Sequence, residues 1–139
     1  MKGHTTFTMI KPDAVSSGHS GGIIKMMEEA GFYIQAMKKT QIRKAVAGQF
    51  YAVHKERPFY QDLCNYMSSG PIIAMVLTKD DAVEDFRELI GTTDPTKASQ
   101  GTIRQIFGTS IEANAVHGSD SDENAIIEAG FFFSQLERH

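Results

Sequence analysis

The spacing of apolar residues along the chain changes between an alternating pattern, typical of strands, and a helical period. Residues 5–10 are rich in threonine and contain Phe7 and Met9, which predicts a first strand. A Lys-Pro-Asp sequence at residues 11–13 ends it, because proline lacks a backbone donor and aspartate favours a turn. Lys11 therefore stands at a strand end, where side chains commonly face a site, although the local sequence alone favours a solvated lysine.

Helical spacing first appears after a glycine-rich loop at residues 17–22. The loop has neither the P-loop pattern nor the GxGxxG pattern, so we interpret it as an irregular segment rather than a phosphate cradle. The helix that follows is expected to end at Gly31, and a second strand to cover residues 32–40. The apolar residues that define this helix are Ile23, Met26, Met27 and Ala30.

Two short helices are expected next, separated by a break at residues 57 and 58. Together they resemble a helical hairpin, a shape that can form the wall of a cleft. On spacing alone, Tyr51 and Phe59 in this hairpin are core positions rather than ligand contacts. The apolar face of the first helix consists of Val46, Phe50 and Val53, and the second helix covers residues 59–67.

A continuous apolar run at residues 72–77 has the composition of a central strand buried on both faces. A helix is expected over residues 81–90, followed by a long irregular segment at residues 91–101. Loops of this size without structure of their own are often functional or mobile. A short helix over residues 102–107, which carries Arg104, completes this part of the chain.

Residues 114–121 (NAVHGSDS) are the stretch with the clearest chemical potential. We interpret them as a strand end that runs into a tight turn carrying His117, with the next helix capped by Ser119 or Ser121. An imidazole placed in this way can act as a nucleophile, a general base or a metal ligand. The stretch alone leaves these roles open.

The chain is expected to close with a helix over residues 122–129, a stop at Gly130 and a final short strand over residues 131–133. The resulting βαββαβ order predicts an α/β (α+β) fold: a ferredoxin-like sandwich whose four mainly antiparallel strands are covered by helices, with the last helix and short strand appended. A small doubly wound parallel sheet is the alternative. We expect a single domain over residues 1–139.

Composition narrows the class of protein. The chain has 139 residues, 41% of them hydrophobic and 22% charged, with a net charge of −3, so general affinity for nucleic acid is not expected. Cys64 is the only cysteine, and its apolar neighbours indicate a buried hydrophobe in a reducing compartment. The N-terminus lacks the apolar core of a signal peptide, and no apolar run reaches membrane-spanning length. A cytoplasmic protein without a membrane partner is expected.

Several chemically capable residues stand at element ends or in loops. Cations bind phosphate oxygens, and an exposed aromatic ring can stack on any base without reading it. Together with His117, such groups would suit a nucleotide with several phosphates, although each one alone fits a structural role and spacing does not show that they converge. The residues are Lys11, Tyr51, Phe59, Arg87, Thr93, Arg104 and Asn114.

The chain resembles a nucleoside diphosphate kinase over nearly its whole length. The stretch at residues 114–121 is close to the family signature and is highly specific, and three further matches occur in the correct order. They are residues 8–15 (TMIKPDAV), 57–59 (RPF) and 101–104 (GTIR).

The resemblance implies a catalytic role for five residues. His117 would be the nucleophile, forming a phosphohistidine in a two-step, ping-pong transfer. Lys11 and Tyr51 would lie near the transferred phosphoryl group. Ser119 and Glu128 would steady the imidazole.

The resemblance also implies how the nucleotide binds. Arg87, Thr93 and Arg104 would hold the remaining phosphates. Asn114, together with the lysine named above, would contact the sugar hydroxyls, and Phe59 would stack on the base. Mg²⁺ would arrive with the nucleotide, bridging its phosphates, rather than in a protein metal site.

The implied enzyme moves the terminal phosphate of a nucleoside triphosphate, typically ATP, to a nucleoside diphosphate, and so maintains nucleoside and deoxynucleoside triphosphate pools. Its partners would be ATP, GTP and the other nucleotides, and it would form a homo-oligomer, a tetramer or hexamer built from dimers. Ser17 and Gln100 depart from a common arginine and a common proline, and neither belongs to the catalytic set. We expect them to affect only loop stability or subunit packing.

Two other interpretations remain. A domain of this fold could bind nucleotide or a protein partner without catalysis; loss of His117 or Lys11 would favour that, and both are present. Alternatively, His117 could be a metal ligand beside Asp120 and Asp122, although no second histidine stands at ligand spacing. The remaining histidines are expected at the surface or in loops: His4, His19, His54 and His139.

Overall fold

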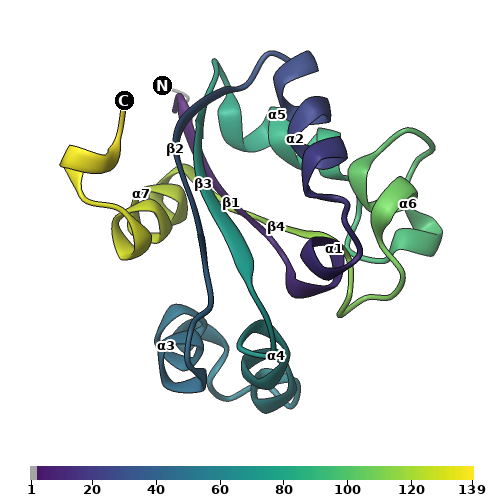
Figure 1. Ribbon diagram of the computed structural model, residues 1–139, viewed down its shortest axis with the longest axis vertical. Helices are drawn as coiled ribbons and strands as arrows, with labels where there is room; N and C mark the ends of the chain where they lie inside the picture. Colours follow the sequence, from purple (N-terminus) through teal and green to yellow (C-terminus); the bar gives the residue numbers. More distant parts are fainter. Residues whose placement is uncertain (1–2) are drawn as a thin grey trace.

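The computed structural model describes residues 3–139; Met1 and Lys2, the start of the N-terminal segment discussed above, lie outside the described residues. One sheet has the strand order β2-β3-β1-β4, and every neighbouring pair is antiparallel (Figure 1). This is the order of a ferredoxin-like fold, so that prediction is confirmed and the parallel alternative is wrong. The strands are β1 (Thr5–Ile10), β2 (Tyr33–Thr40), β3 (Ile72–Thr78) and β4 (Val116–Gly118).

The central strand β3 explains why helices cover both faces of the sheet. Alternate residues of a strand point to opposite faces. Ala74 and Val76 pack in one buried cluster, whereas Met75 and Leu77 pack in another. The first cluster is closed by α3 (Lys44–Phe50), α4 (Tyr60–Met67) and α7 (Asp122–Phe132), and the second by α1 (Pro12–Ser16), α2 (Ser20–Glu29), α5 (Ala82–Ile90) and α6 (Ile103–Phe107) (Figure 1).

The C-terminal end of α7 differs from the prediction. No strand forms over residues 131–133, because α7 continues through Gly130 to Phe132. The ring of Phe132 stacks on that of Phe7, with centroids 5.3 Å apart, and is buried. Packing of this ring against the sheet therefore outweighs the strand propensity of three consecutive phenylalanines.

Two other local expectations are also wrong. Val53 does not share the buried face of α3; it lies in the short 3-10 turn Ala52–His54 and is 84% exposed. His117 lies within β4 rather than on the turn that follows it. The turn instead leads to Ser121, which caps α7 by accepting a hydrogen bond from the backbone of Asn124.

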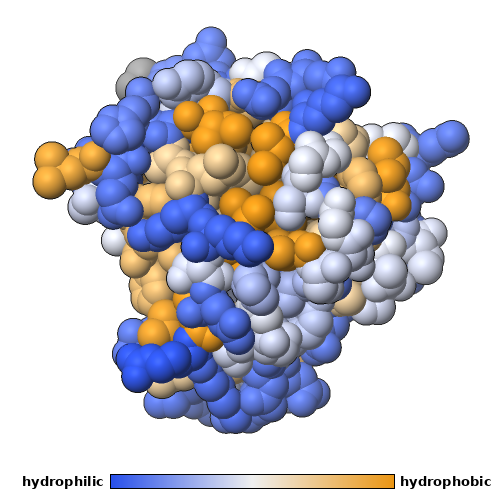
Figure 2. Space-filling model, in the orientation of Figure 1, coloured by the Kyte–Doolittle hydropathy of each residue, from blue (hydrophilic) through white to orange (hydrophobic). Residues whose placement is uncertain are grey.

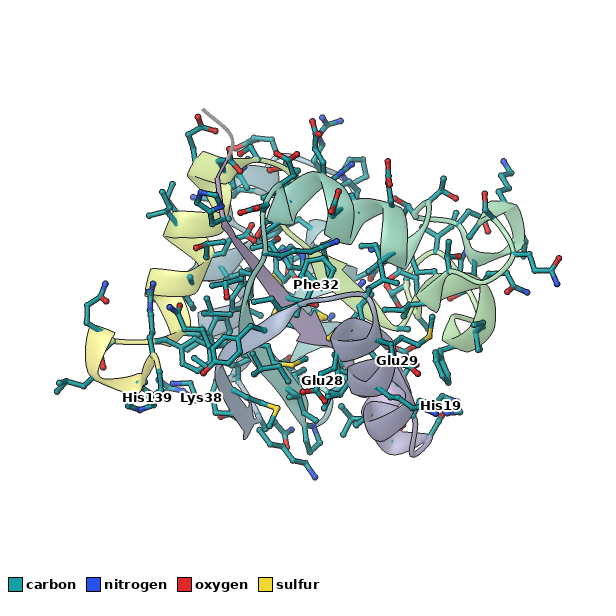
Figure 3. All side chains as sticks on the ribbon, turned by 90° about the horizontal axis from the view of Figure 1, so that it is seen from above. His19, Glu28, Glu29, Phe32, Lys38 and His139 are labelled. Carbon is teal, nitrogen blue, oxygen red and sulfur yellow. The ribbon has the colours of Figure 1, made fainter. Side chains whose placement is uncertain are left out.

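The C-terminal segment folds back beside β2, where His139 and Lys38 lie close together (Figure 3). The amide of His139 donates to the carbonyl of Gln35 at 2.8 Å, and Lys38 pairs with Glu137 at 3.3 Å. No helix within residues 3–139 is both long and apolar enough to cross a membrane.

Candidate active site

The imidazole of His117 is held from one side by a carboxylate. Its Nε2 lies 2.9 Å from Oε1 of Glu128, on α7, and the same oxygen accepts a 2.7 Å hydrogen bond from the Ser119 hydroxyl. The side chains of His117 and Glu128 are each 18% exposed, so the pair is largely shielded from water. Within residues 3–139 no protein group bonds Nδ1. A hydrogen bond at Nε2 favours the tautomer that carries its proton there, leaving the Nδ1 lone pair free to react.

Three aromatic rings lie near this imidazole. The ring centroids of Phe50, Phe7 and Tyr51 lie 5.5, 6.1 and 6.2 Å from that of His117. His117, Tyr51 and Glu128 all line one cavity of about 460 Å³. The hydroxyl of Tyr51 is buried and has no hydrogen-bond partner among the described residues, and burial raises the pKa of this phenol. It is therefore a protonated donor available to a bound group.

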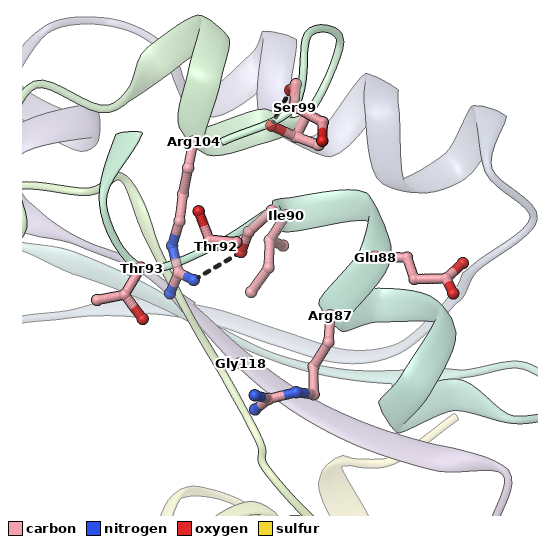
Figure 4. Close-up of a pocket in the computed structure, with 10 residues that line it drawn as sticks. Arg87, Glu88, Ile90, Thr92, Thr93, Ser99, Arg104 and Gly118 are labelled. Carbon is pink, nitrogen blue, oxygen red and sulfur yellow. Dashed lines mark hydrogen bonds between the residues drawn. The ribbon is translucent and has the colours of Figure 1, made fainter. Parts of the chain in front are cut away.

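A second cavity, of about 720 Å³, is shown in Figure 4. Gly118 lines both this cavity and the His117 cavity, so the two adjoin there. Arg87, Thr93 and Arg104 line this second cavity, at the C-terminal end of α5 and in the loop and helix that follow. A Cβ at Gly118 would lie only 2.9 Å from the Ile90 side chain, so the chain leaves little room for any other residue there.

The cations at this second cavity influence one another. The guanidinium of Arg104 donates to the carbonyls of Gly91 and Val116 at 3.0 and 2.9 Å, while its Nε is buried without a partner among residues 3–139. Burial, followed by repulsion from Arg87, lowers the pKa of Arg104 to about 10. Burial, followed by repulsion from Arg104, lowers the pKa of Lys11 to about 8. Arg87 and Arg104 line the second cavity, and Lys11 lies near enough to Arg104 to be repelled by it, although it does not line the cavity itself. A bound anion near these groups would relieve their repulsion.

Lys11 and Asn114 are both buried next to this cationic region rather than exposed. The Lys11 ammonium donates to the carbonyl of Glu112 at 3.4 Å, and the Asn114 amide donates to the carbonyl of Thr93 at 3.0 Å. The Asn114 amide oxygen is buried and unpaired within the described part of the chain. The local interpretation of Lys11 as a solvated side chain is therefore wrong.

Phe59 is the one predicted site residue that stands apart from this convergence. It lies just before α4 and is 48% exposed. Like Lys11, Asn114 and Ser119, it lines neither cavity. Unlike them, it has within residues 3–139 no hydrogen bond or ring contact with the residues around His117 or Arg104 other than through His54. Its ring is 5.4 Å from that of His54, which does line the His117 cavity. The core position that spacing favoured for Phe59 is wrong, whereas Tyr51 is indeed buried.

The alternative of a metal site at His117 is not supported. Asp120 accepts a 2.6 Å hydrogen bond from the Asn124 side chain, and Asp122 accepts one from the Gly3 backbone at 3.0 Å. Across residues 3–139, no group of three or more His, Cys, Asp or Glu side chains is arranged to hold a metal ion. The two aspartates instead make these hydrogen bonds at and just before the start of α7.

Phe50 lies beside His117 and lines the same cavity, although the sequence pattern does not single it out. Its position on an apolar helix face indicated a core role only, and nothing in the sequence shows which ring packs against His117. Gly118 was likewise seen only as part of the motif, and its close approach to Ile90 becomes visible in three dimensions.

The protein-family model described as nucleoside diphosphate kinase matches residues 4–138. The chain belongs to this family. A nucleoside diphosphate kinase from Flavobacterium psychrophilum is 59% identical over 138 residues, which cover 99% of this chain and 99% of the relative. One from Chlorobaculum tepidum is 55% identical over 132 residues, covering 95% of this chain and 94% of the relative.

Solved structures of nucleoside diphosphate kinases have the same fold. The Aquifex aeolicus enzyme superposes with a TM-score of 0.96 at 44% identity, covering 98% of this chain and 99% of that chain. The Halobacterium salinarum enzyme, solved in complex with CDP, superposes with a TM-score of 0.93 at 36% identity, covering 97% of this chain and 90% of that one. Enzymes of this family transfer phosphate between nucleoside triphosphates and diphosphates through a phosphohistidine.

Proposed function

We propose that this nucleoside diphosphate kinase moves the terminal phosphate of a nucleoside triphosphate, typically ATP, to a nucleoside diphosphate through Nδ1 of His117. The observation that carries the proposal is the 2.9 Å contact between His117 Nε2 and Glu128, because it leaves the other ring nitrogen as the nucleophile. This transfer would maintain the nucleoside and deoxynucleoside triphosphate pools.

In the first half-reaction, Nδ1 of His117 attacks the γ-phosphorus of the triphosphate. The N–P bond forms as the bond from phosphorus to the β–γ bridging oxygen breaks, and the nucleoside diphosphate leaves with that electron pair. The ring gains positive charge as it becomes phosphorylated, and the adjacent Glu128 carboxylate offsets that charge. Ser119 donates to the same carboxylate and so fixes its orientation.

In the second half-reaction, a terminal phosphate oxygen of the acceptor diphosphate attacks the phosphorus. The N–P bond breaks, its electron pair returns to Nδ1, and the free imidazole is restored.

The residues of the second cavity, with Lys11 and Tyr51, would stabilise the charge on the phosphate oxygens during the transfer. Arg87, Arg104 and Thr93 would bind the phosphates that are not transferred, while Lys11 and the unpaired Tyr51 hydroxyl would contact the moving phosphoryl group. Phosphoryl transfer depends mainly on alignment and on stabilising charge at the phosphate oxygens, so fixed cations beside an aligned imidazole suit it well. Because donor and acceptor differ by one phosphoryl group, the same site can serve ATP, GTP and the other nucleotides.

Mg²⁺ is proposed as the cofactor, carried by the nucleotide. The side chains that line the second cavity include two arginines, four hydroxyls and a single carboxylate, that of Glu88, so a magnesium ion there would draw most of its oxygen ligands from the phosphates rather than from a protein carboxylate cage. When it is bound with the nucleotide, the ion would reduce the negative charge of the phosphates.

The sugar and base would extend from the phosphates towards the helical hairpin. The buried, unpaired amide oxygen of Asn114, with the Lys11 ammonium, would bind the sugar hydroxyls. The half-exposed ring of Phe59 would stack on the base without reading its edges. This arrangement accommodates both ribose and deoxyribose nucleotides.

Replacing Phe59 with alanine should weaken binding of ADP, GDP and CDP by similar factors, about 10-fold each, because a stacking platform serves every base. Isothermal titration calorimetry with each diphosphate measures this. Phe59→Tyr, which keeps the ring, should bind all three nearly as tightly as the unmodified protein. A loss confined to one base would contradict simple stacking.

Nucleotide binding should take up a proton at alkaline pH. In the free protein burial lowers the pKa of the Lys11 ammonium to about 8, and bound phosphates would raise it towards the ordinary lysine value of 10.5. Between these two pH values, nucleotide binding would therefore protonate the amine. Affinity should therefore fall as pH rises above about 8. Calorimetry at about pH 9 in two buffers with different ionisation enthalpies measures the uptake. Lys11→Met should abolish it, and equal uptake by both proteins would show that another group is responsible.

We also propose a cytoplasmic, homo-oligomeric protein, a tetramer or hexamer built from dimers, with residues 1–139 as a single kinase domain. The buried free thiol of Cys64 suits a reducing compartment.

The proposed oligomer is supported by an exposed apolar surface at strand β2. This strand lies at an edge of the sheet and exposes Tyr33 and Met37, and apolar side chains gather on the face of the molecule where β2 lies (Figure 2). Such exposed apolar side chains suit contact with a second copy of the chain. Light scattering should give a mass that is an even multiple of one chain.

The activity is tested directly with γ-labelled ATP. After nucleotide is removed, label should remain on the protein as an acid-labile, base-stable adduct and should pass to added GDP. A domain that only binds nucleotide would hold ATP without becoming labelled. That outcome would overturn the proposed function.

A further inference from the structure

The backbone just before the nucleophile adopts a strained turn. Ala115 has φ +77°, although it carries a Cβ, and it is fully buried. The amide of Val116 donates to the carbonyl of Asn114 at 3.0 Å, which closes a γ-turn with Ala115 at its centre. A γ-turn with positive φ is rare for a residue other than glycine and persists only where its surroundings hold it.

Both backbone groups of Ala115 are held by the segment that follows β1. Its amide donates to Oδ2 of Asp13 at 3.1 Å, and its carbonyl accepts from the amide of Lys11 at 2.8 Å. Of these two contacts, the one with Asp13 involves a side chain, whereas the one with Lys11 joins two backbone groups. Without the Asp13 carboxylate, a buried amide would lose its partner and the turn would be free to relax.

The Asp13 carboxylate is itself fixed by α4. The Tyr66 hydroxyl donates to Oδ1 of Asp13 at 2.5 Å and accepts from the Asp13 amide at 3.1 Å. Burial, followed by the bond to Asp13, raises the pKa of the Tyr66 phenol, so the hydroxyl stays protonated as a donor. Phe59, the proposed base platform, lies immediately before the same helix. One chain of hydrogen bonds therefore joins this helix to the strained turn.

We propose that Asp13 and Tyr66 are positioning residues that hold the γ-turn at Ala115 and thereby set His117 relative to Asn114. The inference rests on the proposed function, because it assigns the two side chains a part in the same transfer. Asn114 precedes the strained residue and His117 follows it by two positions, so relaxation of the turn would shift the sugar contact and the nucleophile with respect to each other. Small displacements of a nucleophile reduce the rate much more than they reduce binding or stability.

The test compares four variants in rapid-quench measurements of phosphohistidine formation with saturating Mg-ATP. They are Asp13→Ala, Tyr66→Phe, Ala115→Gly and the double variant Asp13→Ala/Ala115→Gly. Tyr60→Phe is the matched control, because Tyr60 lies on the same helix and its hydroxyl donates to the Gly48 carbonyl at 3.0 Å, away from the turn. All measurements are made well below each protein's unfolding midpoint, with KM determined in parallel.

Asp13→Ala should slow phosphohistidine formation by about 10-fold or more, and Tyr66→Phe by a smaller factor, with KM changed less than the rate. Glycine adopts positive φ without steric conflict, so Ala115→Gly should restore much of the rate lost in Asp13→Ala. Should Asp13→Ala fail to fold, the Tyr66→Phe rate still decides the matter.

Rates in Asp13→Ala and Tyr66→Phe equal to that of Tyr60→Phe would overturn the inference, even if their unfolding midpoints fall. Absence of rescue by glycine would overturn the part assigned to the strained turn. Absence of any phosphohistidine in the unmodified protein would instead overturn the proposed function, so the two failures are distinguishable.

Discussion

Replacing His117 with alanine is expected to reduce phosphoryl transfer by about 10⁴-fold or more, because a ping-pong reaction has no path without its nucleophile. Nucleotide binding should persist, since the groups proposed to hold phosphates, sugar and base do not depend on the imidazole. Steady-state transfer from ATP to GDP, with calorimetry for ADP binding, measures both effects. The expected result is a loss in kcat with little change in affinity.

The control for this variant is His4→Ala. The His4 side chain is 65% exposed and pairs with exposed Asp80, far from any proposed role in transfer. It should keep full activity. Substantial transfer by His117→Ala would mean that the phosphoryl group passes directly between nucleotides or through another residue.

Replacing Arg104 with lysine should lower kcat/KM by about 100-fold despite the conserved charge. The guanidinium reaches the carbonyls of Gly91 and Val116 at once and still presents its buried Nε, whereas one ammonium group cannot satisfy these contacts and a phosphate together. Both carbonyls belong to residues next to the candidate site, because Val116 directly precedes His117 and Gly91 lines the second cavity.

Arg43→Lys makes the matched control, because Arg43 is exposed just before α3. It should leave kcat/KM unchanged. If Arg104→Lys retained activity within about 3-fold of the unmodified protein, a point charge would suffice and the proposed fork geometry would be wrong.

Most of the fold could be predicted because its signals are local. The threonine-rich sequence of β1, the apolar run of β3 and the helical spacing of apolar residues in α5 each predict their element, because each pattern places apolar residues where that element is buried. The end of α7 could not be predicted, because Phe132 is helical through its stacking on Phe7, a residue on a strand far away in the sequence. Strand propensity describes the local preference, and tertiary packing overrides it.

The candidate site likewise contains some residues that the sequence predicts and others that only the folded chain reveals. The family signature pointed to His117, and the chain order of motifs pointed to Arg104 and Asn114. The burial of Lys11 was not visible locally, since it arises from segments that meet only in the folded chain. Asp13 illustrates the limit most clearly. Its sequence context predicts a turn former, whereas its carboxylate bonds the amide of Ala115, which lies 102 positions away.

The central claim is that Glu128 holds Nε2 of His117 and leaves Nδ1 to accept the phosphoryl group. It is tested most directly by NMR of the protein with ¹⁵N-labelled histidine after phosphorylation by ATP, which locates the phosphorus on the ring. Phosphorus bonded to Nδ1 of His117, with the proton retained on Nε2, is the predicted result. Phosphorus on Nε2, or on any other residue, would contradict the account.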